Sequence, residues 1–230
     1  MTRFETPFGR IVDLDEKPDR FDPGYALVLA HQALEAGATG PGEQQPVSTP
    51  WGELVAEPRG EHGIVVSLPR HEITAPRVMT TVAAMRLGID RTQVDESGMA
   101  IQELDVGTRV LVVPVASVED LTDGEDPPDL AGVPGTQSEM AVSYTRTQRT
   151  PYVKLRGRLL GPGDALAGLA AAAMHLVTQQ GVRATYPRTR VVGELTGHDG
   201  AFAEITVQAK KAGHGPSVQH LFVGGPVAPV

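Results

Sequence analysis

A run of small apolar residues in the second half of the chain constrains the fold more than any other feature. Residues 165–180 read Ala-Leu-Ala-Gly-Leu-Ala-Ala-Ala-Ala-Met-His-Leu-Val-Thr-Gln-Gln, with Asp164 before them and Gly181 after them. Asp is a favoured N-cap and Gly a favoured residue just beyond a helix end, so the run predicts a helix. A helix that is apolar on every side has to be buried on every side. The rest of the chain must therefore wrap around it.

A second apolar helix is predicted over residues 24–35. Asp22 and Pro23 precede it as an N-cap and first helical residue, and Gly37 follows it. A shorter amphipathic helix is expected at residues 78–87. Most of the remaining chain reads as short strands with Gly- and Pro-rich turns, for example 63–68, 108–115, 203–208 and 219–223.

An internal repeat links the two apolar helices. Residues 24–37 match residues 168–181: both run 14 residues from Gly to Gly, with Ala third and His eighth. Further on, Gly-Glu-Leu at 52–54 recurs at 193–195. We interpret this pattern as a duplication. It predicts an α+β fold of two pseudo-symmetric β-rolls, each wrapped around one central apolar helix.

Charge is unevenly distributed and suggests two domains. Residues 1–130 contain 23 acidic and 10 basic side chains, whereas residues 131–230 contain 5 acidic and 10 basic ones. The stretch 123–129 is acidic and contains two prolines, as linkers often do. Opposite charges on the halves favour their mutual attraction, or pairing in a homodimer. The alternative is that basic side chains of the second half meet an anionic ligand; they are Arg146, Arg149, Lys154, Arg156, Arg158 and Arg183. We predict a first domain, a linker and a second domain at residues 1–122, 123–136 and 137–230.

Composition excludes several classes of protein. A net charge of −8 disfavours nucleic-acid binding, which needs a basic surface. The absence of cysteine excludes disulfides, thiolate metal sites and two-thiol epimerase chemistry. No apolar stretch reaches the length of a membrane span or of a secretory signal, so we expect a cytoplasmic protein that does not bind membranes.

The histidines do not suggest a metal site. His31 and His175 occupy equivalent positions of the repeat, each inside an apolar helix. We interpret both as satisfied core or groove histidines, although a pair of histidines also invites a metal or acid/base reading. The other five show no ligand spacing, so we predict no metal.

Several stretches resemble one known family. They are Gly24–Gly37, Thr49–Leu54, Val66–Pro69, Gly107–Leu121, Asp164–Ala171 and Val223–Val230. Their order and spacing are similar to those of the PhzF-like phenazine-biosynthesis family, which shares its fold with diaminopimelate epimerase. The chain departs from the family at its start, where only 23 residues precede Gly24 and the segment with the family's acid/base glutamate is shortened or replaced.

The resemblance implies a ligand cleft between the domains. It places Asp164 and Tyr25 as candidate catalytic residues and Gly24, Gly163 and Gly168 as candidate ligand-binding residues. Tyr25 follows Gly24 where the family keeps a histidine, and Asp164 also suits a plain N-cap role.

The expected function follows from the same resemblance. It is a cofactor-independent isomerase or cyclase that acts on a small molecule in bacterial natural-product metabolism. The alternative is a non-catalytic member that binds a small molecule or another protein.

Overall fold

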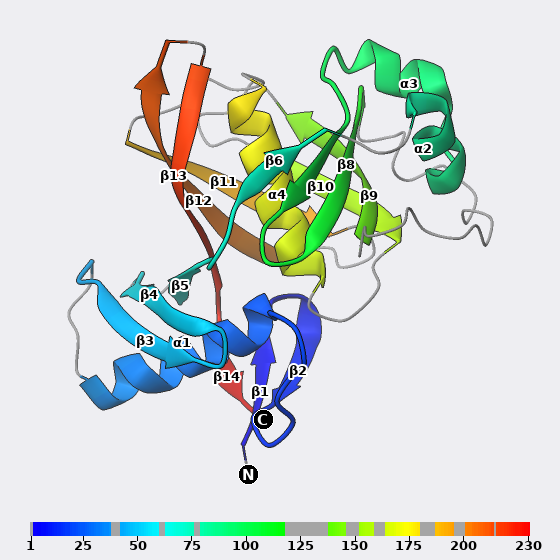
Figure 1. The fold of residues 1–230 in the computed structure, drawn as a ribbon. Coiled ribbons are helices and arrows are strands. Elements are labelled where there is room, and N and C mark those ends of the chain that lie inside the picture. Colours follow the sequence, from blue (N-terminus) through cyan, green and yellow to red (C-terminus); the bar gives the residue numbers. More distant parts are fainter. Residues whose placement is uncertain are drawn as a thin grey trace.

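The computed structural model describes most of the chain as one α+β structure (Figure 1). The residues it describes are 2–37, 42–59, 63–75, 79–117, 138–145, 152–158, 164–179, 187–195, 201–213 and 215–230. Its helices are α1 (Pro23–Gly37), α2 (Thr80–Leu87), α3 (Arg91–Glu96) and α4 (Asp164–Thr178), with a 3₁₀ turn η1 (Pro7–Gly9). The first strands are β1 (Arg3–Thr6), β2 (Arg10–Asp13), β3 (Gln45–Thr49), β4 (Gly52–Pro58), β5 (Ile64–Ser67), β6 (Glu72–Thr74), β7 (Gln102–Asp105) and β8 (Arg109–Val115). The others are β9 (Ser138–Thr145), β10 (Tyr152–Arg158), β11 (Arg188–Leu195), β12 (Phe202–Ala212), β13 (Gly215–Gly225) and β14 (Ala228–Pro229).

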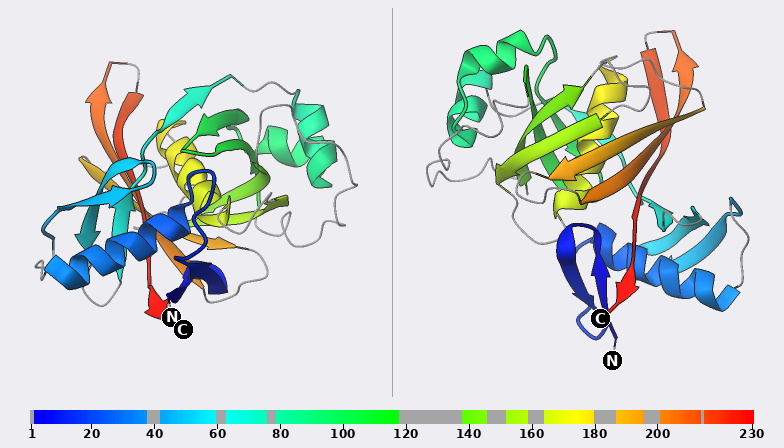
Figure 2. Two further views of the ribbon diagram at one scale, coloured as in Figure 1. Left: turned by 60° about the horizontal axis from the view of Figure 1, so that its bottom comes forward. Right: turned by 180° about the vertical axis from the view of Figure 1, so that it is seen from behind.

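One long, curved sheet organises the molecule. Its strand order is β3-β4-β5-β13-β12-β11-β10-β9-β8-β7-β6. Neighbouring strands run antiparallel except for β8–β9 and β10–β11, which are parallel. Strands β7 to β13 all contact α4, so this part of the sheet curves around the helix (Figures 1 and 2). A small second sheet, in the order β14-β1-β2, joins the two ends of the chain.

Helix α4 confirms the strongest prediction from the sequence. Every residue from Ala165 to Val177 is buried. Its small side chains let the strands approach closely. At Gly193 of β11, for instance, an added Cβ would lie 2.4 Å from a methyl carbon of Leu169. Tight packing of this kind is why a mostly alanine helix can be enclosed by a sheet.

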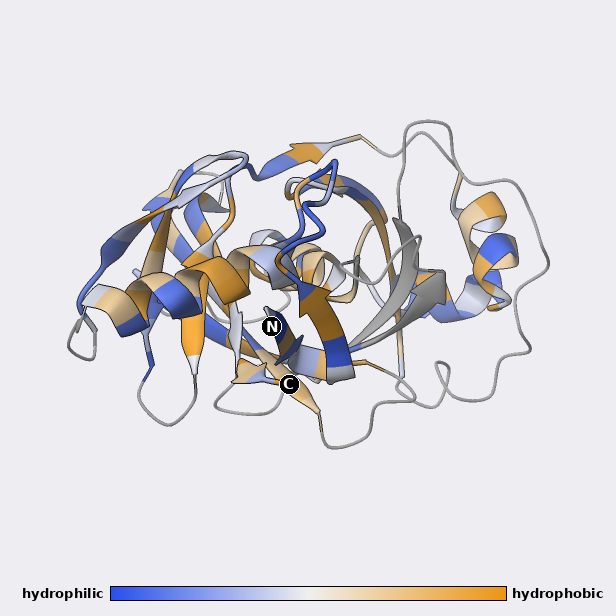
Figure 3. Ribbon diagram, turned by 90° about the horizontal axis from the view of Figure 1, so that it is seen from below, coloured by the Kyte–Doolittle hydropathy of each residue, from blue (hydrophilic) through white to orange (hydrophobic). Residues whose placement is uncertain are grey.

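Helix α1 is enclosed less completely. Residues from Pro23 to Val28 are buried, but the C-terminal half exposes polar side chains such as Glu35, and Figure 3 shows this change along the helix. The helix contacts β1 to β5, and it leaves one side to solvent. The predicted α+β class is confirmed. The pseudo-symmetry of two rolls is not confirmed by this arrangement.

The proposed repeat is offset between the two helices. Gly24 is the second residue of α1, whereas Gly168 is the fifth residue of α4. His31 and His175 are shifted in the same way, by nearly one helical turn. The duplication therefore remains a prediction.

The N-terminal ends of α1 and α4 lie side by side in all the ribbon views (Figures 1 and 2). One continuous hydrophobic core covers both ends and includes Phe8, Phe21, Leu27 and Leu169. The Trp51 ring packs edge-on against Phe21 and Tyr25, at centroid distances of 5.2 and 5.8 Å. The described space between the two helices is therefore filled with apolar side chains.

The predicted domain division stays a prediction. The linker at 123–136 lies outside the described residues. Strand β8 of the predicted first domain pairs directly with β9 of the predicted second domain, with Val110 opposite Ser138. Separately, none of the helices that the structure describes is both long and apolar enough to cross a membrane.

We expect Gly107→Ala to destabilise the fold strongly. Gly107 has a φ of +92°, and a Cβ there would lie 2.4 Å from the Phe21 ring. Positive φ and displacement of a core ring should together cost about 3 kcal/mol of unfolding free energy. Gly52→Ala is the matched control, because Gly52 has a φ of +112° with nothing within 4 Å of the added Cβ. Its expected cost is about 1 kcal/mol. Equal losses in urea denaturation would remove the Phe21 contact as the cause.

Candidate functional site

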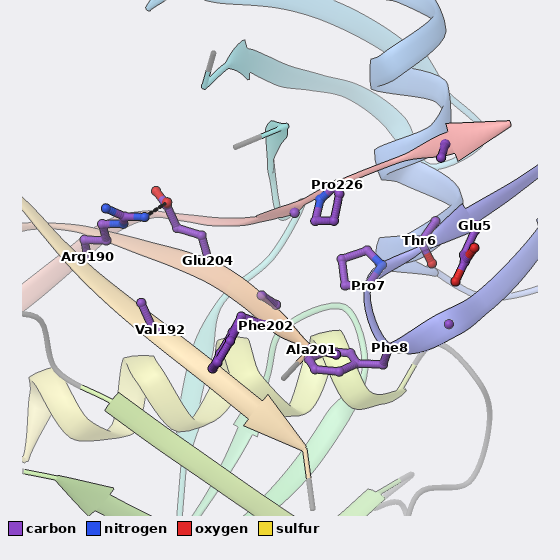
Figure 4. A pocket seen from close by; sticks show the side chains of 14 residues that line it. Glu5, Thr6, Pro7, Phe8, Arg190, Val192, Ala201, Phe202, Glu204 and Pro226 are labelled. Carbon is purple, nitrogen blue, oxygen red and sulfur yellow. Dashed lines mark ion pairs between the residues drawn. The ribbon is translucent and has the colours of Figure 1, made fainter. Parts of the chain in front are cut away.

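A pocket of about 690 Å³ lies between the N-terminal segment and strands β11 and β12 (Figure 4). Its size is typical of sites for small organic molecules. Most of its lining is apolar and comes from Pro7, Phe8, Val192, Phe202 and Pro226. The charged side chains of the lining are Glu5, Arg190 and Glu204. The pocket is therefore an apolar space with polar groups at its margins.

The turn η1 forms one wall under conformational strain. Phe8 adopts φ 68° and ψ 26°, a left-handed conformation that non-glycine residues seldom adopt. Pro7 packs on Gly225, where an added Cβ would lie 2.4 Å from the proline ring. The Thr6 hydroxyl donates to the Arg10 carbonyl at 3.2 Å and closes the turn. Strained residues are found preferentially at binding and catalytic sites, which makes this wall a candidate site.

A nearly buried ion pair connects this wall to α1. The Arg10 guanidinium makes two hydrogen bonds to the Asp22 carboxylate, and the side chains are only 15% and 10% exposed. Asp22 also accepts from the Tyr25 backbone N–H at 3.1 Å, so it is the N-cap of α1. The absent side chain of Gly24 leaves room for the guanidinium, since a Cβ would lie 2.6 Å from Arg10 Nη1. The anion-binding end of α1 is therefore occupied by the chain's own carboxylate.

The opposite wall carries a paired charge network. Arg190 of β11 and Glu204 of β12 form an ion pair of 2.7 Å, drawn as a dashed line in Figure 4. Arg59 lies 4.0 Å from Glu204 and 3.2 Å from Glu57. Glu57, which is buried, also binds Arg188 at 3.1 Å. Each of these three guanidinium groups thus has a carboxylate partner.

Glu5 stands apart from this network. It lies on β1, opposite Ile11 of β2 and Ala228 of β14. Within the described part of the chain, its carboxylate makes no hydrogen bond or ion pair. Figure 4 places it at the end of the pocket away from Arg190 and Glu204. A carboxylate in this position is able to accept and return a proton.

The residues predicted from the sequence lie around the helix ends rather than in this pocket. Tyr25 is buried, and its hydroxyl donates to the Leu14 carbonyl at 3.2 Å. Gly24 accommodates Arg10, and Gly168 is buried within α4. Asp164 begins α4, but its side chain and all of Gly163 lie outside the described residues. Catalytic and ligand-binding roles for these five residues stay predictions.

Sequence reasoning missed the pocket residues. The lining joins segments at positions 5–9, 190–192, 201–204 and 225–228, which only the sheet pairing brings together. The left-handed conformation of Phe8 has no sequence signature. One feature of the sequence could have indicated a site. Glu5 is the acidic residue of a short segment that otherwise contains Phe4, Pro7 and Phe8.

The two helix histidines differ. His175 is fully buried, and its Nε2 lies 2.7 Å from the Ala100 carbonyl. Burial lowers the pKa of His175 to about 4, so the ring is neutral near pH 7. This confirms a satisfied core histidine. His31 is only partly buried and lies 3.3 Å from Glu35, so it is not a core histidine. Among the described residues, no group of three acidic or histidine side chains could hold a metal ion.

Solved structures with similar folds exist at low sequence identity. Neither a protein-family model nor a curated protein matches the sequence. A phenazine biosynthesis protein of the PhzF family from Bacillus anthracis aligns with a TM-score of 0.64 and 11% identity, covering 90% of this chain and 71% of the other. A predicted epimerase from Pseudomonas aeruginosa aligns with a TM-score of 0.60 and 17% identity, covering 95% and 75%. The predicted PhzF-like resemblance is thereby confirmed for the fold.

Proposed function

We propose that the protein is an isomerase that relocates a proton within a small, largely apolar molecule bound in the pocket between η1 and β12. The observation that carries the proposal is the Glu5 carboxylate at one end of an apolar pocket, which has no hydrogen bond or ion pair to the part of the chain that the structure describes. The fold supports it, because one similar structure is described as a predicted epimerase. A role in natural-product metabolism is supported by the other, described as a phenazine biosynthesis protein.

The proposed chemistry needs one acid/base group and no cofactor. Glu5 takes a proton from an activated carbon, and the C–H electron pair shifts along a conjugated system. The resulting carboxylic acid then returns the proton to a different carbon, which restores the carboxylate. Glu5 is exposed, so its carboxyl group can exchange its proton with solvent between turnovers. A cyclisation that begins with the same proton transfer fits the same residues.

A test of this proposal is incorporation of solvent deuterium. The purified protein is incubated in D₂O with the small-molecule extract of its source cells, and products are analysed by mass spectrometry. We expect at least one compound to gain deuterium at carbon, because the Glu5 carboxyl exchanges its proton with solvent. Glu5→Gln should slow this labelling by about a hundredfold.

The matched control is Glu96→Gln. Glu96 is an exposed residue of α3 that does not line the pocket, and its substitution makes the same change in charge. It should label at the rate of the unmodified protein. Equal labelling by the Glu5→Gln variant would remove Glu5 from the chemistry.

A second candidate function is non-catalytic binding of a small molecule. The observation that favours it is that the Tyr25 hydroxyl, Asp22 and Arg190 all have partners within the chain. A compound that binds the pocket and emerges without deuterium from every variant would support this alternative. Homodimer formation and a cytoplasmic location stay predictions.

A further inference from the structure

We propose, on the basis of the proposed pocket, that its ligand is a cationic amine with a flat aromatic body rather than a carboxylic acid. The inference starts from the charges of the described lining. The guanidinium in this lining, that of Arg190, is neutralised by Glu204 at 2.7 Å. Among the described residues, Glu5 has no positively charged partner. A bound carboxylate would be repelled by Glu5, whereas an ammonium group would be attracted.

The surroundings of the pocket do not reverse this preference. Arg10 is held by Asp22, and Arg3 is held by Asp13 at 2.8 Å. Arg59 contacts Glu57 and Glu204. The net charge of the chain, −8, adds a weak long-range field of the same sign as Glu5. Arg59, Arg188 and Arg190 share the carboxylates of Glu57 and Glu204, so that network carries one surplus positive charge. Figure 4 places Arg190 and Glu204 at the opposite end of the pocket from Glu5, so a cation is favoured at the Glu5 end.

The walls indicate the shape of the remainder of the ligand. The Phe202 side chain is 49% exposed although it is large and apolar. Figure 4 shows Phe202 and Val192 on one side, and Pro7, Phe8 and Pro226 across from them. Rings and prolines on both sides suit a planar aromatic body, which stacks on or packs edge-on against aromatic side chains. The amine would then lie toward Glu5.

Three acridines test this inference, because they share one ring system and differ in charge at neutral pH. They are 9-aminoacridine, a cation; acridine, which is neutral; and acridine-9-carboxylate, an anion. We expect 9-aminoacridine to bind about fivefold more tightly than acridine and acridine-9-carboxylate to bind more weakly than both, as measured by fluorescence titration. Raising NaCl from about 20 mM to about 500 mM should reduce the difference, because salt screens exposed charges.

Variants distinguish the effect of the Glu5 charge on binding from the effect of the apolar walls. Glu5→Gln should bring the three affinities to within about twofold of one another, whereas Glu96→Gln should leave the ranking unchanged. Phe202→Ala should weaken all three probes together. Equal affinities for the three probes in the unmodified protein would overturn the amine inference and leave the proposed isomerase pocket standing. Absence of binding by all three would overturn the inference of a flat aromatic amine, whereas the isomerase proposal is decided by the deuterium labelling.

Discussion

Acid is expected to destabilise this protein through His175. In the folded protein, burial lowers the pKa of the ring to about 4 from an ordinary value of 6.5. The unfolded chain therefore takes up a proton as the pH falls below about 6.5, while the folded chain does so only near pH 4. Stability contributed by the neutral ring is complete above pH 6.5 and is lost between pH 6.5 and 4. The expected loss is about 3 kcal/mol.

His175→Gln removes the titration and keeps a side-chain donor near the Ala100 carbonyl. We expect its unfolding free energy, measured in urea between pH 7.5 and 4.5, to fall less steeply than that of the unmodified protein. His71→Gln is a control with a smaller expected effect. Burial also lowers the pKa of His71, but this residue is only half-buried. Its variant should flatten the pH dependence less. Identical slopes for the unmodified protein and His175→Gln would contradict this account.

The sequence predicted the buried helix better than the pairing of the strands that surround it. The composition of residues 165–180 was sufficient to predict a fully buried helix, because an all-apolar helix too short to span a membrane is stable only in a protein interior. What encloses that helix depends on the pairing of β8 with β9 and of β10 with β11. Such pairings join distant segments, and local patterns do not specify them. Helix α3 went unpredicted although Asp90 and Gln93 form a capping box that was readable in the sequence.

The candidate site was less predictable than the fold. Resemblance to a family directed attention to Gly24, Tyr25 and Asp164 at the helix ends. In this chain, the end of α1 is occupied by Asp22 and Arg10. No spacing rule reveals that a carboxylate read as a simple N-cap also has a guanidinium partner 12 residues earlier in the chain.

The ion pair between Arg10 and Asp22 is expected to contribute strongly to the unfolding free energy. Asp22→Ala would leave the Arg10 guanidinium without its carboxylate at a site where it is only 15% exposed. Breaking a buried pair in this way costs about 3–5 kcal/mol, in addition to about 1 kcal/mol for the lost N-cap. Asp90→Ala is the matched control, because Asp90 caps α3 through Thr92 at an exposed position. It should lose only about 1 kcal/mol.

A double variant distinguishes the charge from the packing. Arg10→Met combined with Asp22→Asn replaces both charges and keeps a capping side chain, so it should recover most of the stability lost in Asp22→Ala. If Asp22→Ala costs no more than Asp90→Ala in urea denaturation, the pair contributes nothing beyond the cap.

The same pair has a consequence for the pocket. Arg10 directly follows η1, in which Phe8 holds its left-handed conformation. Such strain persists only where surrounding contacts enforce it. Asp22→Ala should therefore weaken acridine binding under conditions in which the variant is still folded, while Asp90→Ala should leave it unchanged. Unaltered binding by a folded Asp22→Ala variant would mean that Pro7 packing on Gly225 is sufficient to hold the wall.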